Sequence, residues 1–70
     1  MIRFTVKYLD GIWRSSYSTM HSKDEETKYA KELVEMFRHF LHIGSILGYT
    51  VVIETNDGND KHIDVIGTDV

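Results

Sequence analysis

Residues 2–18, IRFTVKYLDGIWRSSYS, decide the first half of the fold. Apolar and polar residues alternate along this segment, which is typical of strands with one buried face. Asp10-Gly11 interrupts the alternation with one of the strongest short hairpin signals. We therefore expect strands over residues 2–9 and 12–19, joined by a tight turn.

A two-residue turn would determine how these strands pair. The expected cross-strand partners, all on the buried face, are Tyr8 with Trp13, Val6 with Ser15, and Phe4 with Tyr17. The outer face then carries a basic and hydroxyl-rich set: Arg3, Thr5, Lys7, Arg14, Ser16 and Ser18. A register shifted by one residue would instead expose the aromatic side chains.

A helix follows, beginning after Ser22. Ser22 and Glu25 form the pattern of a capping box, and acidic residues crowd the first turn, where the helix dipole favours negative charge. We expect the helix over residues 23–47, with Gly48 as the residue that ends it. Gly44, inside this range, is an alternative early end or a place where another backbone comes close.

The helical positions carry a broad apolar arc, about 180° wide at 100° per residue. Its members are Ala30, Leu33, Val34, Phe37, Phe40, Leu41, Gly44 and Leu47. Met36 and Ile43 extend the arc on one flank, whereas Ile46 falls on the polar side. Either the helix sinks deeply into its own sheet, or Met36, Ile43 and Ile46 contact a second chain.

Two further strands are expected in the last third of the chain. Residues 49–55 and 61–66 are rich in β-branched residues, and a turn-forming cluster separates them. A loop with an odd number of residues, over 56–60, would place the apolar positions on one face: Val51, Ile53, Ile63 and Val65. Residues 67–70 are expected to form a loose tail.

These elements predict a single α+β domain over residues 1–70, in the order β-β-α-β-β. The simplest packing lays one long helix on one face of a four-stranded antiparallel sheet. Strand order stays open, although the order 2-1-3-4 would make every neighbouring pair antiparallel. A helix of about 25 residues spans about 37 Å and would overhang strands of about 20–23 Å, which favours a partner along its exposed length.

Composition limits the classes of protein that remain. The chain has 70 residues, 41% of them hydrophobic and 27% charged, a net charge of −3 and no cysteine. This is the composition of an ordered globular domain without disulfides or thiolate metal sites. No apolar run is long enough for a membrane span and no signal peptide is visible, so we expect a cytoplasmic protein. So small a domain gains stability from association, which favours a homodimer.

Few residues have the pattern of a chemical site. His39 and His42 share a helix face with Glu35 close by, but they lie opposite the apolar arc and lack a third, shielded ligand. Glu54 and Asp64 are expected on an exposed sheet face, without the burial that tunes a general acid. No nucleophile or phosphate-loop motif occurs. We therefore expect no enzyme activity, no metal and no cofactor.

The leading functional hypothesis is a non-enzymatic interaction module that dimerises and binds another protein. Its candidate contact residues are Met36, Ile43, Ile46 and Trp13, the last beside the hairpin turn, where it either anchors a partner or caps the core. The alternative is a nucleic-acid-binding accessory protein, because residues 1–23 carry four cations against one acid. Its candidate contacts are Arg3, Lys7 and Arg14. Size alone suggests an origin in a phage, prophage or other mobile element.

Overall fold

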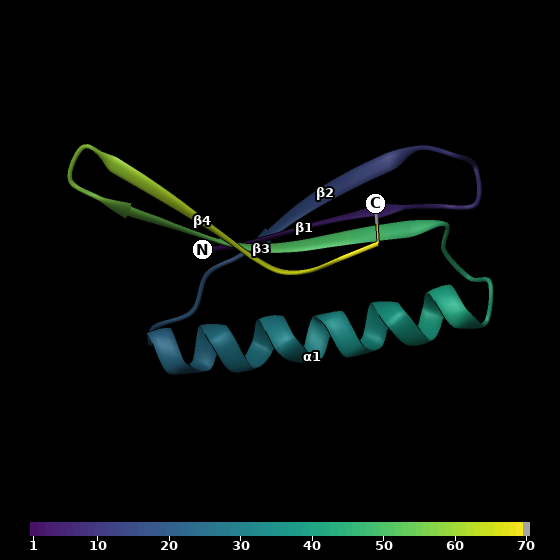
Figure 1. The fold of residues 1–70 in the computed structure, drawn as a ribbon, viewed down its shortest axis with the longest axis horizontal. Helices are drawn as coiled ribbons and strands as arrows, with labels where there is room; N and C mark the ends of the chain where they lie inside the picture. The colour runs from purple at the N-terminus through teal and green to yellow at the C-terminus, as the bar shows by residue number, and fades with distance from the viewer. Residues whose placement is uncertain (70) are drawn as a thin grey trace.

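The computed structural model describes residues 1–69 and has an α+β fold with one sheet and one helix. The elements are β1 (Ile2–Lys7), β2 (Trp13–Ser18), α1 (Lys23–His42), β3 (Gly48–Asp57) and β4 (Asp60–Thr68). The sheet order is β2-β1-β3-β4 with every neighbouring pair antiparallel, which confirms the predicted fold class. Figure 1 shows α1 running along one face of the sheet, with β2 farther from the helix than β1 or β3.

Helix α1 begins as predicted but ends earlier. The Ser22 side chain accepts a backbone hydrogen bond of 3.1 Å from the first turn, as the capping pattern predicts. At the other end, the Gly44 N–H donates to the Leu41 carbonyl and the Ser45 N–H donates to the Phe40 carbonyl, with Gly44 at φ 78°. These paired bonds close the helix at a left-handed glycine. The predicted end at residue 47 is therefore wrong, and the alternative early end at Gly44 is confirmed.

The shorter helix matches the sheet in length. Its 20 residues span about 30 Å, and the 10 residues of β3 span about 33 Å. The expected overhang, which favoured a partner along the helix, is therefore wrong. Within residues 1–69, no helix has both the length and the apolar character needed to cross a membrane.

The core lies between α1 and the central strands. Its buried residues are Ala30, Leu33, Val34 and Phe37 of the helix and Ile2, Val6, Tyr49, Val51 and Ile53 of the sheet. Phe37 stands between Phe4 and Tyr49, with ring centroids 5.9 Å from each. Ile46 joins this core at 6% exposure, because the chain turns back after the helix ends. Its predicted place on the polar side of a longer helix is wrong.

The β1–β2 hairpin differs from the prediction by one loop residue. Its loop has three residues, Leu9, Asp10 and Gly11, and Gly11 takes φ 82° at the third position. The Gly11 N–H donates to the Tyr8 carbonyl at 2.9 Å, and the Tyr8 N–H donates to the Ile12 carbonyl at 3.1 Å. This arrangement is a type I turn followed by a left-handed residue, which glycine adopts without strain.

The extra loop residue moves every β2 side chain to the opposite face of the sheet. Tyr17 pairs with Arg3 and Trp13 pairs with Lys7, on the face opposite the buried core residues. Arg14 turns to the helix side of β2. The predicted pairing, with Trp13 and Tyr17 in the core and Arg14 on the outer face, is therefore wrong.

The β3–β4 hairpin also differs, because its loop has two residues and not five. Strand pairing continues to Asp57 and Asp60, and it places Ile63 opposite Glu54. Ile63 and Val65 therefore face away from the helix and are exposed. The expected odd loop, which would have put both side chains in the core, is wrong.

A bulge in the β3–β4 pairing places Gly67 opposite Val51, on the core side of the sheet. Ile66 packs against the core, and a Cβ at Gly67 would stand 2.7 Å from both γ-carbons of Val34. Because β4 continues through Gly67, the expected loose tail over 67–70 is wrong for its first residues. Val70 lies outside the described residues.

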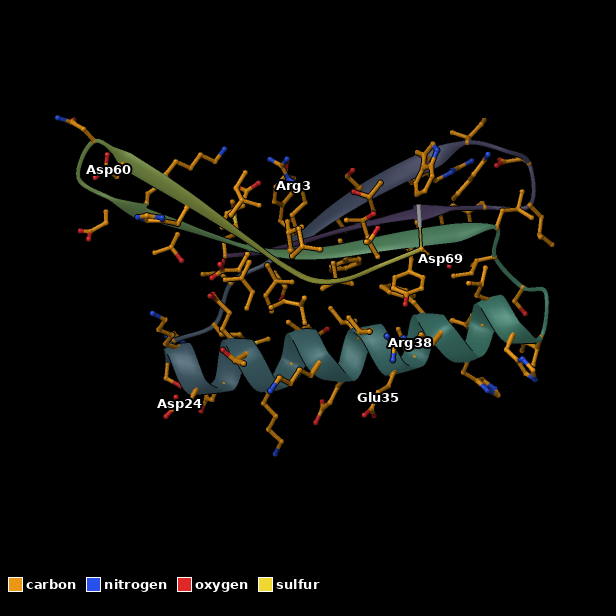
Figure 2. All side chains as sticks on the ribbon, viewed as in Figure 1. Arg3, Asp24, Glu35, Arg38, Asp60 and Asp69 are labelled. Atoms are coloured by element: carbon orange, nitrogen blue, oxygen red, sulfur yellow. The ribbon has the colours of Figure 1, made fainter. Side chains whose placement is uncertain are left out.

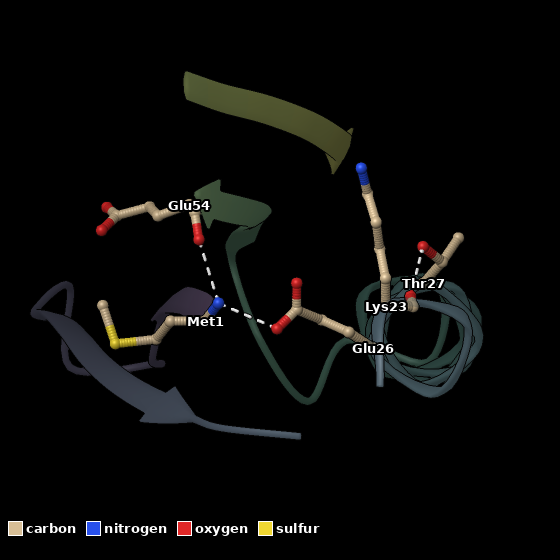
Figure 3. Close-up of polar contacts among 5 residues, drawn as sticks. All are labelled: Met1, Lys23, Glu26, Thr27 and Glu54. Carbon is tan, nitrogen blue, oxygen red and sulfur yellow. Dashed lines mark hydrogen bonds and ion pairs between the residues drawn. The ribbon is translucent and has the colours of Figure 1, made fainter. Parts of the chain in front are cut away.

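Met1 ties the sheet to the helix (Figure 3). Its amino group donates to Glu26 Oε2 at 2.8 Å and to the Glu54 carbonyl at 2.9 Å. Thr27 Oγ1, in the same turn as Glu26, donates to the Lys23 carbonyl at 3.0 Å. The Glu26 carboxylate, which is largely buried, therefore has a charged partner.

Candidate functional site

The open face of the sheet, which is the face opposite α1, carries polar and aromatic side chains together with three aliphatic ones. The strand register assigns to it Arg3, Thr5, Lys7, Trp13, Ser15, Tyr17, Thr50, Val52, Glu54, Asn56, Lys61, Ile63, Val65 and Thr68. Figure 2 shows Arg3 projecting from the sheet on the side opposite α1, whereas Asp24 and Glu35 lie on the helix. Within residues 1–69, no helix or strand lies over this face (Figure 1).

Two aromatic side chains of β2 lie exposed on the open face, each beside a cation of β1. Trp13 is 41% and Tyr17 is 55% exposed. Lys7 Nζ lies 6.0 Å from the centroid of the Trp13 ring, and Arg3 Cζ lies 5.1 Å from that of Tyr17. The two residues are four positions apart along β2, which separates their Cα atoms by roughly 13 Å. Each ring therefore offers a separate stacking surface with a positive charge next to it.

Glu54 holds Arg3 in place on this face. The Glu54 side chain is only 4% exposed, and its two carboxylate oxygens lie 3.0 Å from Arg3 Nη2 and 3.8 Å from Lys61 Nζ. A carboxylate buried to this extent needs a charged partner, so Arg3 and Lys61 offset its cost of burial. The Arg3 guanidinium therefore lies between the Glu54 carboxylate and the Tyr17 ring.

Hydroxyl side chains lie between Arg3 and Lys7 on the open face. Thr5 Oγ1 and Ser15 Oγ are 2.9 Å apart, and Thr50 Oγ1 and Thr68 Oγ1 are 3.0 Å apart. A hydroxyl is both a donor and an acceptor. These pairs add hydrogen-bonding groups without adding charge.

The open face is basic in an acidic chain. It carries three cations, Arg3, Lys7 and Lys61, and one carboxylate, Glu54. The remaining residues carry five cations and ten acids. The net charge of −3 thus divides into +2 on the open face and −5 elsewhere. An anionic partner is favoured on the open face and disfavoured over the rest of the surface.

The structure brings together two of the three predicted nucleic-acid contacts. Arg3 and Lys7 share the open face, but Arg14 lies on the opposite face, with Nη2 3.0 Å from Asp10 Oδ2. The Ile12 backbone N–H, which donates to Asp10 Oδ1 at 2.9 Å, and the Arg14 guanidinium lower the pKa of Asp10 below its ordinary value of 3.8. The Arg14 charge is therefore used within its own hairpin.

The predicted protein-contact residues do not form one surface. Met36 and Ile43 are exposed, seven positions apart along the helix and its C-cap, but Ile46 is in the core. Trp13 lies on the open face, across the sheet from the helix. The set Met36, Ile43, Ile46 and Trp13 is thus divided among three places in the molecule.

The candidate metal and acid–base residues are not brought together either. His39 and His42 are exposed in the last turn of α1. Within residues 1–69, no group of three or more potential ligands among histidine, aspartate and glutamate gathers closely enough to hold a metal ion. Glu54 and Asp64, which the sequence places on one sheet face, lie on opposite faces because of the two-residue loop.

No protein-family model matches this chain, and no curated protein or solved structure shows significant similarity to it. Sequence reasoning missed the exposure of Tyr17 and the contribution of Lys61 to the open face. A register of the first hairpin shifted by one residue exposes the aromatic side chains, and this alternative could have identified Tyr17. No comparable pattern identifies Lys61, because the face on which it lies depends on the length of the β3–β4 loop.

Proposed function

We propose that the protein is a non-enzymatic binding module that holds single-stranded nucleic acid on the open face of its sheet. The observation that carries the proposal is the direct pairing of Trp13 with Lys7 and of Tyr17 with Arg3. Aromatic planes stack on exposed bases, and adjacent cations attract the phosphates. This combination supports the nucleic-acid alternative that the sequence had left open.

Charge and shape both favour a single strand over the other candidate ligands of this face. Two open faces packed against each other would oppose two surfaces that each carry +2, so a second copy is disfavoured there. A duplex hides the faces of its bases in the stack, whereas a single strand presents them to aromatic side chains. The cytoplasmic location expected from the sequence is kept as part of this proposal.

The test uses Trp13, the single tryptophan of the chain, as its own reporter. Short oligo(U) and oligo(dT) strands are titrated into the protein at several salt concentrations, and tryptophan fluorescence is recorded. We expect quenching that saturates and weakens with salt. Because the face has a net charge of +2, the slope of log K against log salt should be about −1.4, at about −0.7 per neutralised phosphate.

Matched variants decide whether the open face is responsible. Lys7→Gln should reduce the salt slope in magnitude by about 0.7, because one phosphate contact is lost. Lys28→Gln removes the same charge from the exposed surface of α1 and should leave binding unchanged. Absence of quenching at low salt overturns the proposal, as does an equal loss of affinity in both variants.

A second candidate function, binding of another protein, has one observation in its favour. The β1–β2 and α1–β3 connections lie at the same end of the molecule (Figure 1), and both carry exposed apolar side chains: Leu9, Ile12, Ile43 and Leu47. The Leu47 N–H donates to the Lys7 carbonyl at 2.8 Å, which joins the two segments. An apolar end of this kind suits a protein partner.

The double variant Ile43→Ser, Leu47→Ser separates the two candidates. It should abolish capture of any protein that the wild-type chain retains, and it should leave oligonucleotide binding unchanged, because neither residue lies on the open face. Retention of the captured protein by this variant contradicts the second candidate. A phage or mobile-element origin would be compatible with either function and remains a hypothesis from size alone.

A further inference from the structure

The two edges of the sheet differ in how well they are protected against pairing with another strand. β4 carries three charged residues, Asp60, Lys61 and Asp64, and a bulge interrupts its pairing with β3. β2, WRSSYS, is a regular strand whose one charged residue, Arg14, is bound to Asp10 of the same hairpin. Charges and bulges are the usual means by which proteins protect a sheet edge, so β2 is the unprotected edge.

The backbone groups of three β2 residues point outward from the sheet. The Tyr8 N–H donates to the Ile12 carbonyl, which makes this a hydrogen-bonded pair. Bonded and non-bonded pairs alternate along an antiparallel ladder. The backbone N–H and C=O groups of Trp13, Ser15 and Tyr17 therefore point away from β1. The Lys7 carbonyl, opposite Trp13, agrees with this assignment because it accepts from Leu47 on the β3 side.

We propose that two copies of this chain pair antiparallel through β2, with Ser15 opposite Ser15 of the partner subunit. In this register all three outward-pointing residues of each copy form bonded pairs. Trp13 then lies opposite Tyr17 of the partner subunit, and the reciprocal pair forms on the other side of the two-fold axis. The result is one continuous eight-stranded sheet.

This register is favoured because β2 is complementary to itself. Trp13 and Tyr17 are equally distant from Ser15 and share the open face, so each aromatic side chain meets an aromatic partner across the new ladder. A register shifted by two positions would place Tyr17 opposite Ser15 and leave Trp13 without a partner inside the strand. The pairing also joins two open faces side by side, although its basis is independent of what that face binds.

The absence of cysteine from the chain allows a direct test. In Ser15→Cys the two sulfur-bearing residues would face each other with Cα atoms about 5.5 Å apart, within reach of a disulfide. In the matched control, Ser16→Cys, the same atoms would be about 8 Å apart, which is too far. We expect mild oxidation to cross-link most of the first variant and little of the second.

Any other pattern overturns the proposed pairing. Equal cross-linking of both variants indicates random collision, preferential cross-linking of Ser16→Cys indicates another register, and no cross-linking indicates that β2 does not pair. Sedimentation equilibrium of the unmodified chain provides a second measurement that needs no cysteine. It should show a concentration-dependent dimer, which Ser15→Lys dissociates while its circular dichroism stays unchanged; a monomer at several hundred micromolar contradicts the proposal.

Discussion

Trp13 packs against Gly48, two strands away. A Cβ at Gly48 would stand 3.1 Å from Trp13 Cη2, although Lys7 of β1 lies between the two residues in the sheet. The indole therefore reaches across β1 instead of extending directly into solvent. Glycine at position 48 allows this close approach, and so the position of one stacking surface depends on a residue that touches no ligand.

Gly48→Ala should move the indole without unfolding the protein. The new methyl group is tight against Trp13, but the half-exposed ring can shift toward solvent, and Gly48 has no positive φ that alanine would strain. We expect a red-shifted tryptophan emission and weaker oligonucleotide binding. The loss of stability in urea should be about 1 kcal/mol or less. Unchanged emission and affinity would contradict the described packing.

Gly67→Ala should be more damaging, because its methyl group meets the core. A Cβ there lies 2.7 Å from both γ-carbons of Val34, on the buried side of α1. Overpacking of this kind costs about 1–3 kcal/mol, which urea denaturation measures. Val34→Ala in the same chain removes the clashing carbons. The double variant should therefore be more stable than the sum of the two single changes predicts, by about 0.5–3 kcal/mol; strict additivity would mean that the two residues do not meet.

The carboxylate of Asp10 should titrate below its ordinary pKa of 3.8, with the Ile12 N–H as the main cause. Because the folded-state pKa is lowered, the ionised carboxylate stabilises the hairpin at every pH above the pKa that Asp10 has in the unfolded chain. That contribution is lost as the pH falls through the folded pKa. A carbon-detected NMR titration measures the shift directly. Arg14→Ala should leave the pKa still lowered, because the Ile12 N–H continues to donate to the carboxylate; a return to 3.8 in that variant would contradict the contribution of the backbone bond.

Glu54→Gln should strengthen oligonucleotide binding. Glu54 is the single acid among the described strand residues of the open face, so its neutral analogue raises the charge of that face from +2 to +3. We expect the salt slope to steepen by up to about 0.7. Glu35→Gln, which removes one acid from the exposed surface of the helix, is the control and should have a smaller effect. Weaker binding in Glu54→Gln would mean that the carboxylate is needed mainly to hold Arg3.

The elements of the fold were predictable from the sequence, but the buried faces of β2 and β4, the two strands that follow a hairpin loop, were not. Alternation in β1 and β2 and the Ser22 cap predict strands and a helix where they occur. Side-chain placement depends on loop length, and one extra loop residue reverses every face of the following strand. Asp10-Gly11 is compatible with both a two-residue and a three-residue loop. With Gly11 in the left-handed conformation the loop has three residues, and this loop length places Trp13 and Tyr17 on the exposed face instead of in the core.

The residues of the candidate site on β1 were predictable from the sequence, whereas those that follow a hairpin loop were not. Arg3 and Lys7 belong to β1, whose face follows from its own alternation, and both were placed correctly on the outer face. Arg14 follows the loop and was misplaced. Lys61 comes after the second loop, so its position beside Glu54 depends on a turn that ends at Asp60. Local patterns therefore specify the first strand, and each hairpin loop leaves open which face of the following strand is buried.

The central position of β1 also determines how the chain reaches its native state. Ile2 pairs with Ile53, so most of the chain lies between the two strands at the centre of the sheet. The first hairpin can form early from local contacts, but it has little core of its own until β3 is in place. Closing so long a loop before the hydrophobic contacts form slows folding and couples both halves of the sheet in one cooperative step. Truncation anywhere before residue 53 should therefore leave an unfolded chain, and not a stable first hairpin.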